Sequence, residues 1–170
     1  QSFEHEIIWT DINIGMRSSF LNLREDGPKA VMQALGQQTD VFIESFRGRS
    51  MERLGFGVEQ MTDGHRGLIY LSMRCYSWDG PWRDRGGFDM EALTTSGFTL
   101  AEGAGTPRFP ATMVLNDYIA GYIGAAGILA ALRRRAAEGG SYHVRVNLTR
   151  AAMWYASLGM FDTLEFDTTN

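Results

Sequence analysis

The sequence predicts an α/β fold in which an open, largely parallel sheet is flanked by helices. Three strand-like segments carry this prediction: two short apolar runs at 40–46 and 67–73, and a segment at 142–148 that alternates polar and apolar residues. Segments with helical character separate them along the chain. Strands that alternate with helices are typical of a parallel sheet joined by crossover helices.

The first half of the chain begins, on this interpretation, with a short strand at 18–23. A helix should follow near Pro28, because proline is tolerated in the first turn of a helix. The strand at 40–46 should be buried, since its centre is continuously apolar. A short helix at 51–54 comes next, and Gly55 is placed to end it.

The second half contains two loops and three further helices. The loops lie at 75–87, which is dense in Trp, Gly, Asp and Arg, and at 102–110, which is rich in Gly and Pro. The helices are expected at 89–98, 117–138 and 149–160. We expect the first and last of these helices to be capped by their own first residues, Asp89 and Thr149.

Composition excludes several classes of protein. The chain has 170 residues, 44% of them hydrophobic and 21% charged, which is typical of a globular domain and not of a disordered chain. Its net charge of −4 argues against a general binder of nucleic acids or membrane surfaces. The longest uncharged apolar-and-small run, 118–132, is shorter than the roughly 20 residues of a membrane span. These properties fit a soluble cytoplasmic enzyme.

Cysteine and histidine give no sign of a metal site or of a disulfide. Cys75 is the single cysteine, so no internal disulfide can form. His5, His65 and His143 are not at metal-ligand spacing. We therefore expect no metal cofactor.

The segment 117–138 combines an acidic first residue with many small residues. Glycine inside a helix costs about 0.5–1 kcal/mol relative to alanine, so its glycines indicate that something packs close to the backbone. This could be the sheet or another helix, or else a ligand or partner chain. Asp117 could be a simple N-cap, or a carboxylate nucleophile held ionised at a helix N-terminus.

The loop at 76–85 mixes aromatic rings with fixed charges. It could be a structured cover over the edge of the core, or the wall of a binding pocket. The residues themselves leave both interpretations open.

Taken in order, the motifs resemble the family III CoA-transferases, which include formyl-CoA transferase, carnitine CoA-transferase of the CaiB/BaiF type and 2-methylacyl-CoA racemase. The resemblance runs from about residue 12 to residue 154, in the family's order and nearly its spacing. The matching stretches are Arg17-Ser18-Ser19-Phe20-Leu21-Asn22-Leu23-Arg24, 40–46, Met51-Glu52-Arg53-Leu54-Gly55, 79–89, Asn116-Asp117-Tyr118 and Val144-Arg145-Val146-Asn147-Leu148.

The resemblance implies a role for Asp117, which falls where the family has its catalytic aspartate. In that family the carboxylate attacks an acyl-CoA thioester, and CoA is then carried as an aspartyl-CoA thioester before it passes to a free carboxylic acid. Such a mechanism uses CoA and acyl-CoA as substrates and needs no metal. The implied large domain is Rossmann-like.

The resemblance also implies contacts with CoA. Arg24 stands where the family usually has a lysine near the nucleotide phosphates, and Arg53 matches an arginine at the adenine end. Leu21 and Phe46 match apolar contacts to the nucleotide and pantetheine. Ser45 replaces the more usual asparagine, and the Pro-Gly turn that commonly follows is absent here.

Phe88 separates two reaction types within the family. In the racemase branch a histidine just before the residue matched by Asp89 exchanges a proton, which a phenylalanine ring cannot do. The expected substrate-pocket residue Phe88 therefore favours CoA transfer. The alternatives are a 2-methylacyl-CoA racemase or epimerase, and a non-catalytic fragment that only binds CoA.

The resemblance also suggests that residues 1–170 form part of a large CoA-binding domain. The family's first strand and its smaller C-terminal domain have no counterpart in this sequence. Family members form interlocked dimers, so a homodimer is expected.

Overall fold

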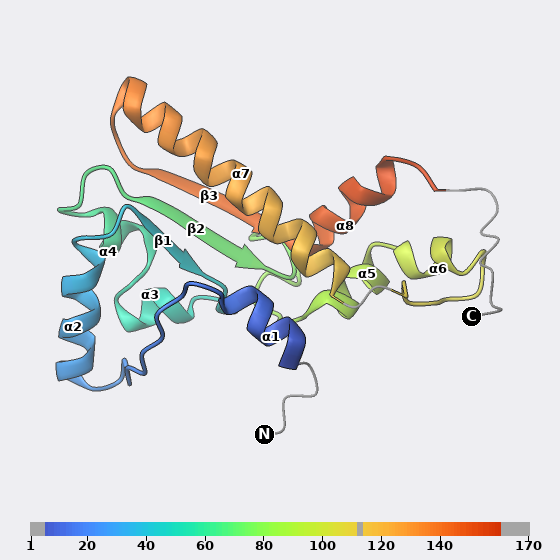
Figure 1. Cartoon of the computed structure of the whole chain (residues 1–170), viewed down its shortest axis with the longest axis horizontal. Helices are drawn as coiled ribbons and strands as arrows, with labels where there is room; N and C mark the ends of the chain where they lie inside the picture. Colours follow the sequence, from blue (N-terminus) through green and yellow to red (C-terminus); the bar gives the residue numbers. More distant parts are fainter. Residues whose placement is uncertain (1–5, 112–113, 161–170) are drawn as a thin grey trace.

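The computed structural model describes residues 6–111 and 114–160, and its centre is a three-stranded sheet (Figure 1). The strands are β1 (Val41–Glu44), β2 (Ile69–Arg74) and β3 (Tyr142–Asn147), in the order β1-β2-β3. Both pairings are parallel, which confirms the predicted sheet. Three strands were therefore placed correctly from their apolar and alternating patterns.

Eight helices surround the sheet in the described residues. They are α1 (Glu6–Asn13), α2 (Asp26–Gly36), α3 (Ser50–Leu54), α4 (Val58–Thr62), α5 (Asp89–Thr95), α6 (Phe98–Glu102), α7 (Leu115–Glu138) and α8 (Leu148–Ser157). Figure 1 shows α7 running along one face of the sheet, with α2, α3 and α4 gathered beside β1 and α5, α6 and α8 at the far end of the molecule.

The two faces of the sheet differ because side chains alternate along each strand. One face carries apolar side chains such as Leu71 and Val144, which are paired in register. The other face carries Ser72 opposite Arg145, flanked by Tyr70 and Arg74. Tyr70 on this face also packs against buried side chains of α3 and α4.

Helix α7 covers the apolar face, and its small residues allow the close approach. A Cβ atom at Gly124 would lie 3.2 Å from Leu71 Cδ2, and one at Gly127 would lie 2.7 Å from Val144 Cγ1. The expectation of close packing against the sheet is thus confirmed for both glycines. Near the other end of the helix, Arg135 donates hydrogen bonds to the backbone of Gly67 and to Asp40.

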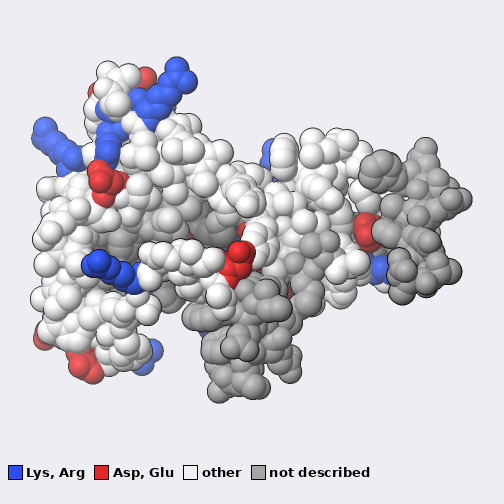
Figure 2. Space-filling view, viewed as in Figure 1, with Lys and Arg blue, Asp and Glu red and all other residues white. Residues whose placement is uncertain are grey.

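The C-terminal end of α7 is basic. Figure 2 shows cations grouped over this end of the helix, where the run 133–135 lies. Cations are favourable there because the last carbonyl groups of a helix carry partial negative charge.

The length and composition of α7 also allow a membrane span, since an 18-residue window of it is sufficiently apolar. The run 118–132 counted from the sequence was shorter than this window. Length and composition are weak evidence, because a helix in the core of a soluble protein shares them. Within this helix, Gly124 and Gly127 pack against the sheet.

Two further apolar clusters complete the core. Beside β1, buried side chains from the sheet, α3 and α4 pack together, and the Tyr70 hydroxyl donates a hydrogen bond of 2.8 Å to the carbonyl oxygen of Phe56. At the far end, Leu93 of α5, Phe98 of α6 and Ala152 of α8 form a third cluster. This last cluster holds the helices that surround the start of α7.

Several local predictions were wrong. Residues 18–23 form no strand, because no neighbouring strand pairs with them in the described chain, and Phe20 is exposed. Helices α1 and α4 were not predicted. The helix predicted at 89–98 ends at Thr95 as α5, and Gly97, whose φ of 81° is left-handed, separates it from α6, which was not predicted.

The two predicted caps were also wrong. The helix α8 is capped by Asn147, whose side chain accepts a hydrogen bond of 2.7 Å from Arg150 N, while Thr149 Oγ1 donates to the carbonyl oxygen of Cys75. At α5, the carboxylate of Glu91 accepts from Phe88 N at 3.0 Å. The carboxylate of Asp89 is therefore available for another partner.

The glycines of α7 give a test of this packing. Gly127→Ala should lower the free energy of unfolding by about 1–3 kcal/mol, because the new methyl group overlaps Val144. Gly121→Ala is the matched control, since no atom lies within 4 Å of its Cβ position. It should raise the free energy of unfolding by about 0.5–1 kcal/mol through helix propensity. Equal effects in urea denaturation would contradict this account.

Candidate active site

Asp117 lies in the first turn of α7, two residues after the helix begins at Leu115. The residue before the helix, Val114, has a φ of 50°, which is a left-handed conformation that is unfavourable for a β-branched side chain. Asp117 is therefore not the N-cap of the helix. The interpretation of this residue as a simple N-cap is wrong. Its side chain is exposed to solvent.

The start of α7 is capped from another helix. The Asp89 carboxylate of α5 accepts hydrogen bonds from the backbone N–H groups of Asn116, at 3.0 Å, and of Asp117, at 3.2 Å. Asp89 itself is buried. A buried carboxylate at a helix N-terminus satisfies N–H groups that have no partner within the helix.

Burial, together with a smaller effect of the neighbouring Asp89 carboxylate, raises the pKa of Asp117 to about 6. The Asp117 carboxyl group reaches solvent, yet the protein around it removes enough water to disfavour its charge. At neutral pH the group is still mostly ionised and can act as a nucleophile.

Asn116 connects the site to α8. Its Nδ2 donates a hydrogen bond of 3.0 Å to the carbonyl oxygen of Leu148, at the start of α8, while its buried Oδ1 has no hydrogen-bond partner. Helices α5, α7 and α8 thus meet beside Asp117. Phe88, which immediately precedes α5, is exposed at the same junction.

Four of the residues expected to contact CoA lie directly after β1 or in the segment before α2. Ser45 and Phe46 follow β1 and are exposed, and Phe46 N donates a hydrogen bond of 2.9 Å to the buried carboxylate of Glu44. Leu21 is half-buried and Arg24 is exposed in the segment before α2. Their contacts with CoA stay predictions.

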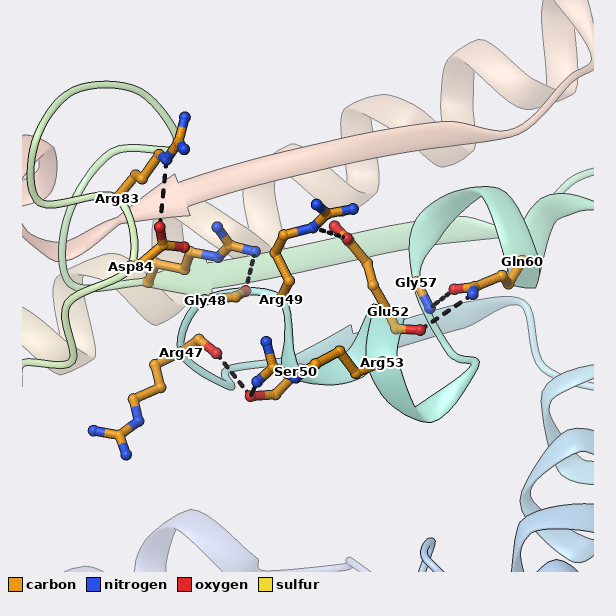
Figure 3. Close-up of polar contacts among 11 residues, drawn as sticks. Arg47, Gly48, Arg49, Ser50, Glu52, Arg53, Gly57, Gln60, Arg83 and Asp84 are labelled. Carbon is orange, nitrogen blue, oxygen red and sulfur yellow. Dashed lines mark hydrogen bonds and ion pairs between the residues drawn. The ribbon is translucent and has the colours of Figure 1, made fainter.

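Arg53 lies in α3 and lines a cleft of about 780 Å³ that is open along the polar face of the sheet. Figure 3 shows the α3 side of this region, where Arg53 donates a hydrogen bond to Ser50 Oγ and Arg49 pairs with Glu52. Asp117 is not among the residues that line the cleft.

Sequence reasoning missed three features of these sites. It predicted that Asp89 caps its own helix, whereas Asp89 caps α7. It also did not identify Asn116 as a link to α8, and it did not place Arg74 and Arg145 in one cleft. The alternation in β3 puts His143 and Arg145 on one face, which is a usable signal. Their pairing with β2 is not visible in the sequence.

In the described ranges, no three His, Cys, Asp or Glu side chains come together in a way that could hold a metal ion. His5 lies outside these ranges. His143 is a component of the polar face, where its Nε2 lies 2.9 Å from Ser72 Oγ.

Known structures resemble this arrangement of sheet and helices. A crystal structure of the hypothetical protein Rv3272 from Mycobacterium tuberculosis matches 85% of this chain and 41% of its own, with a TM-score of 0.78 and 29% sequence identity. A CAIB/BAIF family protein from Brucella suis shares the fold, with a TM-score of 0.78 at 23% identity over 85% of this chain and 38% of its own. The class is thus an α/β protein with the fold of these two structures.

The model of CoA-transferase family III matches residues 2–169, and the chain belongs to this family. It is 33% identical to an acetyl-coenzyme A transferase, nodX, from Hypoxylon pulicicidum, over 92% of this chain and 28% of that protein. It is also 33% identical to the succinyl-CoA–L-malate CoA-transferase beta subunit from Chloroflexus aurantiacus, over 81% of this chain and 35% of that protein. The chain therefore spans about a third of the length of these relatives.

The raised pKa of Asp117 makes a prediction about stability. Because the folded pKa of about 6 lies above the ordinary aspartate pKa of 3.8, the folded protein loses stability as pH rises from about 4 to 6. Asp117→Asn has no carboxyl group to ionise here, so this variant does not lose stability over that pH range. The free energy of unfolding of the variant relative to the wild type should therefore increase over that range and then level off.

Denaturant unfolding at a series of pH values tests this prediction. Asp63→Asn, at the end of α4, is the comparison variant, since it also removes one exposed carboxylate. A difference between Asp117→Asn and the wild type that stays constant from pH 4 to pH 7 would contradict the assignment.

Proposed function

We propose that the protein carrying this chain transfers CoA between an acyl-CoA and a free carboxylic acid, with Asp117 as the covalent nucleophile. The proposal rests on the position of Asp117 in this member of the family. Its carboxylate faces solvent in the first turn of α7, and the buried carboxylate of Asp89 lies beside it. Both named relatives are CoA-transferases by their descriptions.

The first half of the reaction moves CoA onto the protein. An Asp117 oxygen attacks the thioester carbonyl carbon, the new C–O bond gives a mixed anhydride, and the C–S bond breaks to release the CoA thiolate. The thiolate then attacks the Asp117 carbonyl carbon. The original acyl group leaves as a carboxylate, and Asp117 carries CoA as a thioester.

The second half reverses these steps with a different acid. The incoming carboxylate attacks the aspartyl thioester and releases the thiolate, which then attacks the acyl carbon of the new anhydride. The products are a new acyl-CoA and a free Asp117 carboxylate. No net proton or electron is consumed, so the cycle needs neither an oxidant nor a nucleoside triphosphate.

The surroundings of Asp117 suit these steps. Because Asp89 accepts the Asp117 N–H, the nucleophile's own carboxylate is not needed to cap the helix. The positive end of the α7 dipole favours the negative charge that develops during attack. A pKa near 6 leaves the nucleophile ionised at neutral pH and more basic than an ordinary aspartate.

CoA recognition is assigned in this proposal to Leu21, Arg24, Ser45, Phe46 and Arg53. Binding energy from the remote nucleotide would position the thioester for attack. Phe88 would line the acyl pocket, since it is exposed directly before α5. A homodimer in the cytoplasm completes the proposal.

Asp117→Ala should reduce CoA exchange between an acyl-CoA and a free acid by more than about a thousandfold, because the covalent route is lost. Glu138→Gln is the control on the same helix, at its opposite end, and should leave exchange unchanged. Isotope exchange into acyl-CoA measures both variants in the protein that contains this chain. Exchange that survives Asp117→Ala would overturn the nucleophile assignment.

The wild-type rate should also rise with pH through about 6, as Asp117 ionises. Mass spectrometry after incubation with acyl-CoA should find CoA on the peptide that contains Asp117. A rate that is flat between pH 5 and pH 7, with no adduct, would contradict the proposed order of steps.

Phe88 gives a test against racemisation. Without an acid or base at this position, the protein should wash no deuterium from D₂O into the α-carbon of a 2-methylacyl-CoA. Wash-in at a rate comparable to CoA exchange would favour the racemase alternative. CoA binding by calorimetry without any exchange would favour a non-catalytic role.

A further inference from the structure

A second pocket, of about 630 Å³, lies past the carboxyl ends of β2 and β3. One wall is the loop after β2, with Tyr76, Pro81 and Trp82. The other wall is the start of α8, with Arg150 and Met153. Ligands of open α/β sheets bind beyond the carboxyl ends of the strands, and the volume is in the range of small-molecule sites. None of the residues assigned above to the nucleophile, to CoA recognition or to the acyl pocket lines this pocket.

The two walls are joined through the carbonyl oxygen of Cys75. Thr149, at the start of α8, donates to this oxygen from its backbone N at 3.0 Å and from Oγ1 at 2.9 Å. Cys75 is buried and directly precedes Tyr76, which packs against the core cluster that contains Leu71. The fold itself therefore fixes both walls, and a pre-formed pocket lowers the entropy cost of binding a ligand.

The walls leave aromatic and apolar surface uncovered. Trp82 is 41% exposed and Met153 is 48% exposed. The centroid of the Trp82 ring lies 5.2 Å from that of Tyr76, at an interplanar angle of 64°, and 5.5 Å from the guanidinium carbon of Arg85. Trp82 is thus held by two neighbours while part of its ring remains free for a contact with another ring.

Arg150 has no partner on the protein that explains its position. In the described residues its guanidinium forms no ion pair, hydrogen bond or cation–π contact. It lies in the first turn of α8, where the helix dipole disfavours a cation. The backbone N–H groups of Thr149 and Arg150 are already bonded within the protein, so an anion in this pocket would bind the guanidinium and not the helix N-terminus.

Asp79 limits the charge of a ligand. It lines the same pocket, is exposed, and its carboxylate forms no ion pair in the part of the chain that the structure describes. One carboxylate on the ligand can bind Arg150, whereas a second would be repelled by Asp79. The pocket therefore favours a ligand with a single anionic group.

We propose that this pocket binds an aromatic monocarboxylate, with its ring against Trp82 and Tyr76 and its carboxylate on Arg150. Aromatic rings attract one another in offset or edge-to-face arrangements, and a guanidinium binds a carboxylate through two parallel hydrogen bonds. The sulfur of Met153 adds a favourable contact for the edge of a ring. The inference goes beyond the transfer reaction, because the ligand is bound and not converted, and because Asp117 does not line the pocket.

Calorimetric titration of the protein that contains this chain tests the site. The probe is 2-naphthoate, which combines a flat ring system with one carboxylate. Each comparison compound changes one property: 2-naphthamide lacks the charge, acetate lacks the ring, and 2,6-naphthalenedicarboxylate adds a second carboxylate. We expect each of them to bind about tenfold or more weakly than 2-naphthoate. A comparison compound that binds as tightly as 2-naphthoate would overturn the assigned class of ligand.

Two substitutions separate the contact with the carboxylate from the contact with the ring. Arg150→Gln should weaken binding of 2-naphthoate about tenfold or more, and Trp82→Leu should weaken binding of 2-naphthoate and 2-naphthamide alike. Arg133→Gln, at the exposed end of α7, removes the same charge outside the pocket and should bind like the wild type. Thermal unfolding identifies a variant that does not fold. Arg150 is exposed, so its variant tests the site if Trp82→Leu is unstable.

Competition separates this pocket from the transfer reaction. An excess of CoA should not displace 2-naphthoate, and Asp117→Ala should bind it like the wild type. Displacement by CoA, absence of binding in the wild type, or equal binding by Arg150→Gln and Arg133→Gln would each overturn the site. Loss of CoA exchange with intact 2-naphthoate binding concerns the nucleophile only, and absence of 2-naphthoate binding with intact exchange concerns the pocket only.

Discussion

The hydrogen bonds from the start of α7 to the Asp89 carboxylate are the contact on which the candidate active site depends. They satisfy two N–H groups that no residue within the helix can satisfy, and they do so with a charge that the helix dipole favours. They also join α5 to α7, while Asn116 joins α7 to α8. Burial raises the pKa of Asp117 and the same carboxylate adds to the shift, so one buried side chain both positions the nucleophile candidate and contributes to its basicity.

One face of the sheet packs against α7, and polar residues of the other face line a cleft. Leu71 and Val144 face α7, whose glycines bring the helix axis close to the strands. Residues one position along the same strands, such as Ser72 and Arg145, face the cleft. A strand period of two thus lets the same three strands supply the core and an open polar surface. The helix that carries Asp117 and the arginines of the cleft consequently lie against opposite faces of one rigid element.

Much of the fold was predictable because its strongest signals are local. The three strands and the 24-residue helix follow from runs and periodicity, and the order of motifs gave the family. The errors arose where a partner distant in sequence decides the outcome. Asp89 caps a helix that starts 26 residues later, and nothing in its own neighbourhood indicates this. Residues 18–23 have the composition of a strand but no strand to pair with in the described chain. The cleft required the register between β2 and β3, which a single sequence does not contain.

Val114, at the residue before α7, has a consequence for how the protein comes apart. A β-branched residue at positive φ stores about 1–3 kcal/mol of unfavourable backbone energy. The packing along the rest of α7 must offset that energy, which is released as soon as the first turn opens. Local unfolding should therefore start at the end of α7 that carries Asp117, while the half held by Gly127 against β3 opens last. The amide hydrogens of the first turn would then exchange with solvent well before those of the sheet, and heat would disable the site before it melts the domain.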